Sequence, residues 1–296
     1  MSLFSLLGAL EIGLIFSLVA LGVLISFRLL RFPDLTVDGS FPLGGAVAAT
    51  LISGGVDPFT ATLAATAAGA VAGLVTGWLN VRLRIMDLLA SILMMIALYS
   101  VNLRIMGKPN VPLITEPTVF TILQPDWLSD YVARPLILVG VVIVVKLALD
   151  WFLATQTGLA MRATGSNGRM ARAQGVNTGA MILAGMALSN ALVGLAGALF
   201  AQTQGGSDIS MGIGTIVIGL AAVIVGESIL PSRKLVLATL AVILGAIVYR
   251  FFIALALNSD FIGLQAQDLN LVTAVLVTIA LVIPMMKRRL LGKKGA

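Results

Sequence analysis

The chain has 296 residues, of which 59% are hydrophobic and 11% are charged, and its mean hydropathy is +1.06. A soluble domain carries about 25% charged residues, so this composition excludes a soluble globular protein and predicts a polytopic protein of the lipid bilayer. The sequence has no cysteine and no histidine, which excludes disulfides, thiolate chemistry and imidazole metal sites. Its net charge of +6 comes from basic residues between apolar segments and at the C-terminal end, which indicates membrane topology and no nucleic-acid partner.

Nine apolar segments are each roughly long enough to span a bilayer. They cover residues 3–27, 38–54, 58–79, 87–103, 135–153, 178–201, 211–228, 235–257 and 269–286. The first is too long for the core of a cleavable signal and has no basic region before it, so we expect it to remain as a helix. We therefore expect an all-α membrane protein of about nine (8–10) transmembrane helices, forming a single transmembrane domain over residues 1–296.

Basic residues follow the first, third, fifth, seventh and ninth segments, whereas the other connections are acid-rich, mixed or nearly uncharged. By the positive-inside rule, this alternation predicts an N-terminus outside the cell and a C-terminus inside.

The stretch RFPDLTVDGSFPLGG, residues 31–45, places two acids beside membrane-grade segments. A charge at the bilayer centre costs about 2.5–3.5 kcal/mol on insertion scales, and the adjacent proline and glycine indicate a helix that starts late, near residue 42. Its polar side chains are expected to cap that helix or to line a translocation path, with ion coupling by a carboxylate as a third reading. They belong to Asp34, Thr36, Asp38 and Ser40.

Two further features follow in chain order. Gly69, Gly73 and Gly77 form a double small-xxx-small stripe, which predicts close helix packing. The connection 104–134 carries three prolines with Trp127 and Tyr131, and we expect an external loop, partly helical, that either docks an external partner or is a simple connector.

An internal repeat emerges when the sequence is shifted by 174 positions. This shift places Asp34 on Asp208, Thr36 on Ser210 and Asp38 on Gly212. Asp208 and Ser210 would then cap the helix that starts near residue 212. The repeat halves cover about 3–103 and 178–286, with 135–153 as the unpaired linker helix, and the odd number of spans between them predicts inverted topology with the pathway at their interface.

The stretch TGLAMRATGSNGRMARAQGVNTGA, residues 157–180, belongs to a loop at 154–177 that the charge rule places inside. Asn167 is an N-cap candidate, and Gly175 suits the C′ position of a two-turn helix. This helix is small on one face and basic on the other. It fits a groove of a cytosolic protein, or a surface position held by lipid headgroups.

The sequence resembles the permease subunits of bacterial ATP-binding-cassette (ABC) importers for branched-chain amino acids and simple sugars. PDLTVDGS resembles the DLSVGS element of the sugar members, and residues 88–111 are similar to a narrower branch linked to uptake of tryptophan, tyrosine or other small molecules. Asp38 stands where the sugar members have glycine, which argues against carrying over sugar specificity. The loop residues that carry the resemblance are Gly158, Arg162, Ala163, Gly165, Asn167, Ala171, Gly175 and Val176.

The resemblance implies a permease of the bacterial cytoplasmic membrane that works as a homodimer or paired core. Two cytosolic ATPase subunits would carry ATP and Mg²⁺ and grip the loop, while an external binding protein would deliver an amino acid or related solute. This chain would be no enzyme and would hold no cofactor or metal, and it lacks the GxxxxGK[ST] phosphate loop. The residues expected at the ATPase contact are Arg162, Asn167, Arg169, Met170, Ala171 and Arg172.

Two other classes of protein remain open on the residues alone. An ion-coupled secondary transporter could work without an ATPase and use Glu11, Asp34, Asp38 and Asp208 as ion sites. A membrane-embedded enzyme is disfavoured because the sequence offers no histidine, no cysteine and no cluster of inward acids.

Overall fold

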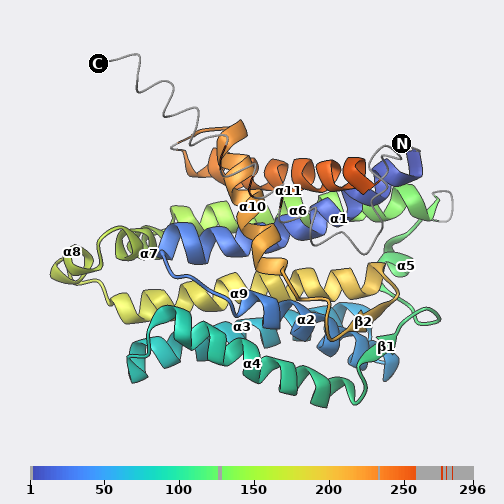
Figure 1. The fold of residues 1–296 in the computed structure, drawn as a ribbon, viewed down its shortest axis with the longest axis horizontal. Coiled ribbons are helices and arrows are strands. Elements are labelled where there is room, and N and C mark those ends of the chain that lie inside the picture. Colours follow the sequence, from blue (N-terminus) through green and yellow to red (C-terminus); the bar gives the residue numbers. More distant parts are fainter. Residues whose placement is uncertain are drawn as a thin grey trace.

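The computed structural model describes residues 3–125, 129–232 and 234–257, with single positions at 275, 278 and 282. These residues are mainly helical (Figure 1). The elements in chain order are α1 (Leu3–Val23), the π-helix η1 (Leu24–Leu30), α2 (Val37–Ser53), α3 (Pro58–Leu83), α4 (Asp87–Met106), β1 (Asn110–Pro112), α5 (Val119–Leu123), α6 (Asp130–Ala154), α7 (Gln156–Ser166), α8 (Gly168–Ala173), α9 (Thr178–Thr203), β2 (Gly206–Asp208), α10 (Thr215–Ile229) and α11 (Leu235–Leu257).

Six helices of the described chain are long and apolar enough to cross a membrane, which makes the chain a multi-pass membrane protein. Two of the nine expected spans are short helices, of which α2 matches its predicted span 38–54 to within one residue and α10 is shorter than its predicted span 211–228. α2 has 17 residues and α10 has 15, so at 1.5 Å per residue they reach about 25 Å and about 22 Å, less than the hydrocarbon thickness of about 30 Å. The ninth expected span, 269–286, lies outside the described residues apart from three single positions.

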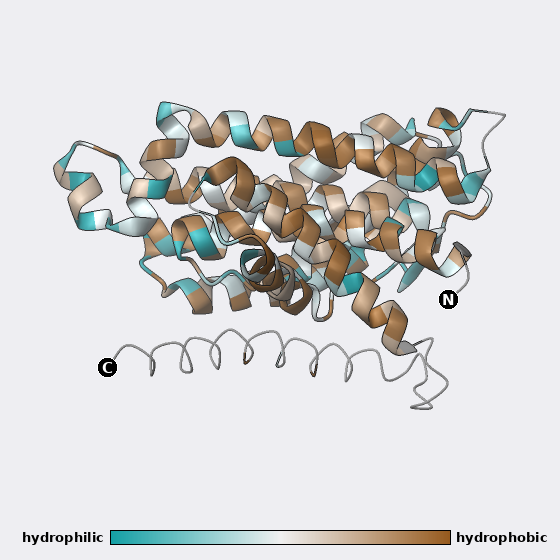
Figure 2. Cartoon of the chain, turned by 90° about the horizontal axis from the view of Figure 1, so that it is seen from above, coloured by the Kyte–Doolittle hydropathy of each residue, from teal (hydrophilic) through white to brown (hydrophobic). Residues whose placement is uncertain are grey.

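The long helices lie side by side along the longest axis of the molecule, and α10 crosses their direction (Figure 1). At one end of the bundle α7 and α8 project beyond the other helices. At the opposite end lie α5, β1, β2 and the start of α1. We call these the α8 end and the strand end. Hydrophobic residues dominate the long helices, and hydrophilic residues gather toward the two ends (Figure 2).

Glycines set the closest helix contacts. α3 packs along α9, where a Cβ added at Gly69 or Gly73 would lie 2.3 Å from the carbonyl oxygen of Asn190 or 2.1 Å from that of Met186. Gly77 contacts Leu183 one turn further along. Such distances leave no room for a side chain, so the glycine stripe allows α3 and α9 to approach backbone to backbone.

Two groups of three helices, α2 with α3 and α9 and α10 with α11 and α1, pack in corresponding ways. α2 packs on α3 and α9, while α10 packs on α11 and α1. α3 packs along α9, and α11 packs along α1. At the strand end, β1 pairs with β2 in an antiparallel ribbon that joins the connection after α4 to the connection after α9.

Candidate functional site

The chain between η1 and α2 runs into the interior of the bundle. Arg31 ends η1 with a left-handed backbone (φ 56°), and the amide of Phe32 donates to the carbonyl of Ser26 at 2.8 Å. The next residues bring Asp34 and Thr36 to fully buried positions. The Thr36 amide donates to Asp34 Oδ1 at 2.9 Å, which closes a turn immediately before α2.

A buried polar network surrounds Asp34. Asn190 on α9 donates through Nδ2 to Asp34 Oδ2 at 2.8 Å, and its Oδ1 accepts from the hydroxyl of Ser40 at 2.7 Å. The hydroxyl of Thr36 lies 2.9 Å from that of Thr76 on α3. All five side chains are fully buried. The network therefore joins the start of α2 to α3 and α9 in a region where an unpaired polar group is costly.

Asp38 has a different role from the cap expected for its own helix. α2 begins at Val37, five residues earlier than predicted, because the chain continues as a helix through Pro42. The carboxylate of Asp38 instead accepts from the amides of Gly214 at 3.3 Å and Ile216 at 2.7 Å. Asp38 thus caps the N-terminus of α10, whose own N-cap residue, Gly214, has no side chain to do so.

The segment before α10 lies directly on the first turns of α2. A Cβ at Gly212 would lie 2.1 Å from the carbonyl oxygen of Asp38 and 2.5 Å from Cδ of Pro42. Proline has no N–H, so Pro42 cannot form the helical bond to that carbonyl. Gly45, one turn on, faces Ser207 and Met211. The two N-termini therefore meet with no room for another side chain.

Asp208 and Ser210 do not cap α10, because α10 starts at Thr215 and takes its cap from Asp38. Asp208 accepts from the Ser210 amide at 2.8 Å and from the Ser210 hydroxyl, and so forms its own turn at the strand end. These bonds from Ser210 lower the pKa of the exposed Asp208 carboxyl from its ordinary value. The i to i+2 bond repeats the one between Asp34 and Thr36.

The α8 end presents a short capped helix. Asn167 accepts from the Met170 amide at 3.0 Å, and Gly175 follows the helix with φ +83°. Met170 is 60% exposed, and Arg169 and Arg172 are also exposed, with Arg162 half-buried. Ala171 is buried and faces the chain itself, so it does not belong to the exposed face.

The α8 end is also joined to the bundle core. A Cβ at Gly165 on α7 would lie 1.8 Å from the carbonyl oxygen of Leu29 in η1. Arg28, also in η1, forms an ion pair of 2.7 Å with Glu227 near the end of α10. η1 therefore contacts the segment that carries α8 and lies one short connection from the Asp34 network.

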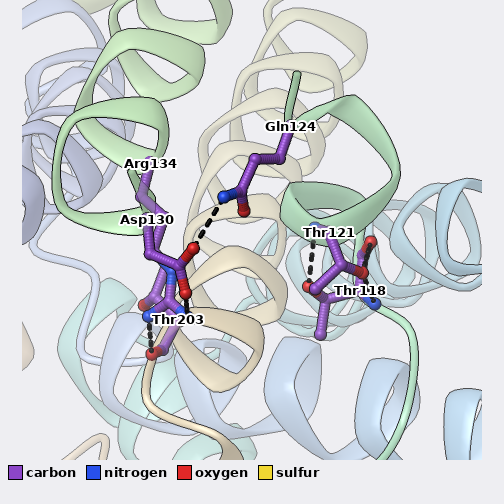
Figure 3. A network of polar contacts seen from close by, with 6 residues as sticks. All are labelled: Thr118, Thr121, Gln124, Asp130, Arg134 and Thr203. Carbon is purple, nitrogen blue, oxygen red and sulfur yellow. Dashed lines mark hydrogen bonds and ion pairs between the residues drawn. The ribbon is translucent and has the colours of Figure 1, made fainter. Parts of the chain in front are cut away.

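At the strand end, polar contacts hold α5 against the bundle (Figure 3). Thr118 and Thr121 form a capping box, and Gln124 donates to Asp130 at 2.6 Å. Arg134 donates to the carbonyl of Thr203 at the end of α9, at 3.4 Å. The expected loop at 104–134 is thus partly helical, while Trp127 lies outside the described residues.

Three polar side chains within apolar helices escaped the sequence reading. They are Asn190, Gln202 and Asp150. Gln202 on α9 accepts from the Val119 amide of α5 and donates to the Thr62 hydroxyl of α3. Asp150 pairs with Lys146 and accepts from the Thr239 hydroxyl at 2.7 Å. An isolated polar residue in a membrane segment is itself a signal of a buried partner.

Groups of three or more acids that could hold a metal ion are absent from the part of the chain that the structure describes.

These observations define a class of protein: a multi-pass membrane protein in which two short helices begin inside the bundle and meet at their N-termini, an arrangement typical of membrane transporters. Residues 5–284 match the family described as the branched-chain amino acid transport system permease component. The chain belongs to this family of permeases.

The relatives agree with this assignment. A tyrosine transport system permease protein of Clostridioides difficile is 37% identical over 265 residues, covering 90% of this chain and 86% of the relative. An uncharacterized protein of Rickettsia prowazekii is 35% identical, covering 93% and 96%. A galactofuranose transporter permease protein of Escherichia coli is 27% identical, covering 59% and 50%. The resemblance found in the sequence is therefore confirmed.

Proposed function

We propose that this chain is the transmembrane permease of an ATP-driven ABC importer in a bacterial cytoplasmic membrane. In this proposal a pair of permeases takes up an amino acid or related small solute that an external binding protein delivers. The observation that carries the proposal is membership of the permease family over nearly the whole chain. The tyrosine permease relative makes tyrosine the first solute to test.

We place the α8 end in the cytosol, in agreement with the distribution of basic residues. There Arg169, Met170 and Arg172 would contact a cytosolic ATPase that holds ATP and Mg²⁺. The exposed Met170 between two arginines supports this assignment, because an apolar side chain flanked by charges is suited to a protein groove. Ala171 is left out of the proposed contact because it is buried.

We further propose that residues 1–296 form one transmembrane domain built from two inverted halves, with α6 as the linker. The corresponding packing of α2 with α3 and α9, and of α10 with α11 and α1, supports this reading. The matching turns at Asp34 and Asp208 support it independently. Rocking of the halves, driven by ATP binding at the α8 end, would then expose a central path alternately to each side.

Reconstitution tests the function. Proteoliposomes with the permease, its ATPase and its binding protein should take up tyrosine only with ATP, and the permease alone should move none. Uptake by the isolated permease, driven by a proton or sodium gradient, would instead establish the secondary transporter.

Charge reversal tests the contact surface. Arg169→Glu combined with Arg172→Glu should abolish co-purification of the ATPase while membrane insertion stays normal. Reversal of two basic residues near the strand end, Arg104→Glu with Lys108→Glu, is the matched control and should leave the complex intact. Stoichiometric ATPase on the first variant would refute the proposed contact.

A further inference from the structure

We propose that Asp38 is a positioning residue that forms a separable joint between the two short helices, holding the N-terminus of α10 on α2 in one state of the transport cycle and releasing it in the other. This inference rests on the proposed transport function and names a residue through which that function acts.

The joint connects distant parts of the chain. The two amides that donate to Asp38, from Gly214 and Ile216, lie 176 and 178 residues away in the sequence. α2 otherwise packs mainly on α3 and α9, and α10 mainly on α11 and α1, so α2 and α10 meet in a small area. The carboxylate of Asp38 therefore provides the directional contact between two helices that are held by different neighbours.

The side-chain caps of the long helices α3 and α9 and of the short helix α8 are local. Asp57 caps α3 by accepting from Phe59 and Thr60, and Asn167 and Asn177 cap α8 and α9 in the same way. In each case the cap moves with its own helix. α10 takes its cap from another helix, so relative movement of α2 and α10 must break or re-form the cap.

The burial of the two acids differs in a way that suits this role. Asp34 is fully buried with its partners, so separating it from Asn190 would leave an unpaired polar group in the interior. Asp38 is only partly buried. Water can therefore replace the amides as donors to the carboxylate when the joint opens, which makes separation less costly at Asp38 than at Asp34.

The backbone beside the joint also favours movement. Pro42 leaves the carbonyl of Asp38 without its helical donor, so the first turn of α2 lacks one of its stabilising bonds. Gly214 has a left-handed backbone (φ +82°) and can change conformation at low cost. Asp34 thus anchors the start of α2, and Asp38 connects that anchor to α10.

The test uses Asp38→Asn in the full complex with its ATPase and binding protein. The amide cannot accept from both backbone N–H groups as the carboxylate does and loses the charge. We expect the solute taken up per ATP hydrolysed to fall at least about tenfold, equivalent to about 1.4 kcal/mol. Asp57→Asn is the matched control, because it changes the same group at a local cap. In this variant the solute taken up per ATP hydrolysed should stay at the wild-type value.

A second readout follows the helices directly. The chain has no cysteine, so spin labels on cysteines introduced at Val47 in α2 and Val217 in α10 report their separation by electron paramagnetic resonance. In the wild type this distance should be narrowly distributed and should shift on ATP binding. Asp38→Asn should broaden it before ATP is added, and Asp57→Asn should not.

The proposed role of Asp38 would be refuted if Asp38→Asn changed neither the solute taken up per ATP hydrolysed nor the distance distribution. Equal losses of uptake per ATP in Asp38→Asn and Asp57→Asn would refute it as well. If Asp38→Asn does not accumulate, Asp38→Glu carries the same test, because it keeps the charge but moves it by one methylene. Absence of ATP-driven uptake by the wild-type complex would instead refute the transport proposal, and the distance distributions would still decide whether Asp38 joins the helices.

Discussion

The side-chain amide of Asn190 donates a hydrogen bond of 2.8 Å to the carboxylate of Asp34, across 156 residues of sequence. The same amide group accepts from Ser40. One side chain of α9 therefore satisfies two groups at the start of α2. Its place among buried neighbours makes it the residue on which the polar network depends.

Replacing this residue should destabilise the bundle. Asn190→Leu removes the partners of Asp34 Oδ2 and of the Ser40 hydroxyl, at about 1–3 kcal/mol for each unsatisfied group. Thermal unfolding of the detergent-solubilised protein, followed by tryptophan fluorescence, should shift clearly downward. Ser228→Ala is the control, because that exposed hydroxyl bonds only within its own helix and its loss should leave the transition in place. A wild-type transition in Asn190→Leu would contradict a structural role for the network.

Gly165→Ala should weaken the contact between α7 and η1. The added methyl group would lie 1.8 Å from the carbonyl oxygen of Leu29, a distance that backbone atoms cannot accommodate without moving apart. We expect a lower melting temperature and weaker stimulation of ATPase activity by solute-loaded binding protein. Gly168→Ala in the same segment meets no atom within 4 Å and should have neither effect. Equal melting temperatures and equal ATPase stimulation in the two variants would show that the contact between α7 and η1 contributes neither to stability nor to coupling with the ATPase.

The pair of Lys146 and Asp150 should show strong non-additivity. It joins α6 to α11 through Thr239, and both charges are nearly buried. Removing one partner, as in Lys146→Met, leaves an unpaired buried charge, at about 3–5 kcal/mol. The double variant Lys146→Met with Asp150→Leu should recover most of that loss in thermal unfolding. Additive losses in the double variant would contradict the pairing.

Asp208 should make stability depend on acid pH. Its pKa is lower in the folded chain than its ordinary value of 3.8, because Ser210 donates to the carboxylate. A lowered pKa stabilises the fold above 3.8, and this stabilisation is lost as the pH falls through the folded value. The wild type should therefore lose melting temperature more steeply than Asp208→Asn below this pH. Parallel curves for the two proteins would rule out this contribution, which solvent screening keeps small.

The sequence predicted the elements better than the partners of the polar residues. Hydropathy located α11 at its observed bounds, and the capped helix after Asn167 followed from local chemistry. The expected span 38–54 agrees with α2 to within one residue, but a late helix start near residue 42 is wrong, because the helix continues through Pro42. No local pattern could assign Asp38 to α10 or Asn190 to Asp34, since both contacts depend on how distant helices pack.

The long separation of these partners has a consequence for biogenesis. Asp34 leaves the ribosome 156 residues before Asn190, and Asp38 leaves it 178 residues before Ile216. The N-terminal helices therefore enter the membrane with two acids whose distant partners do not yet exist, and they cannot reach their final arrangement until α9 and α10 are made. A chain truncated before α9 should consequently be held by the insertion machinery or degraded, which makes synthesis of the second half the checkpoint for assembly of the first.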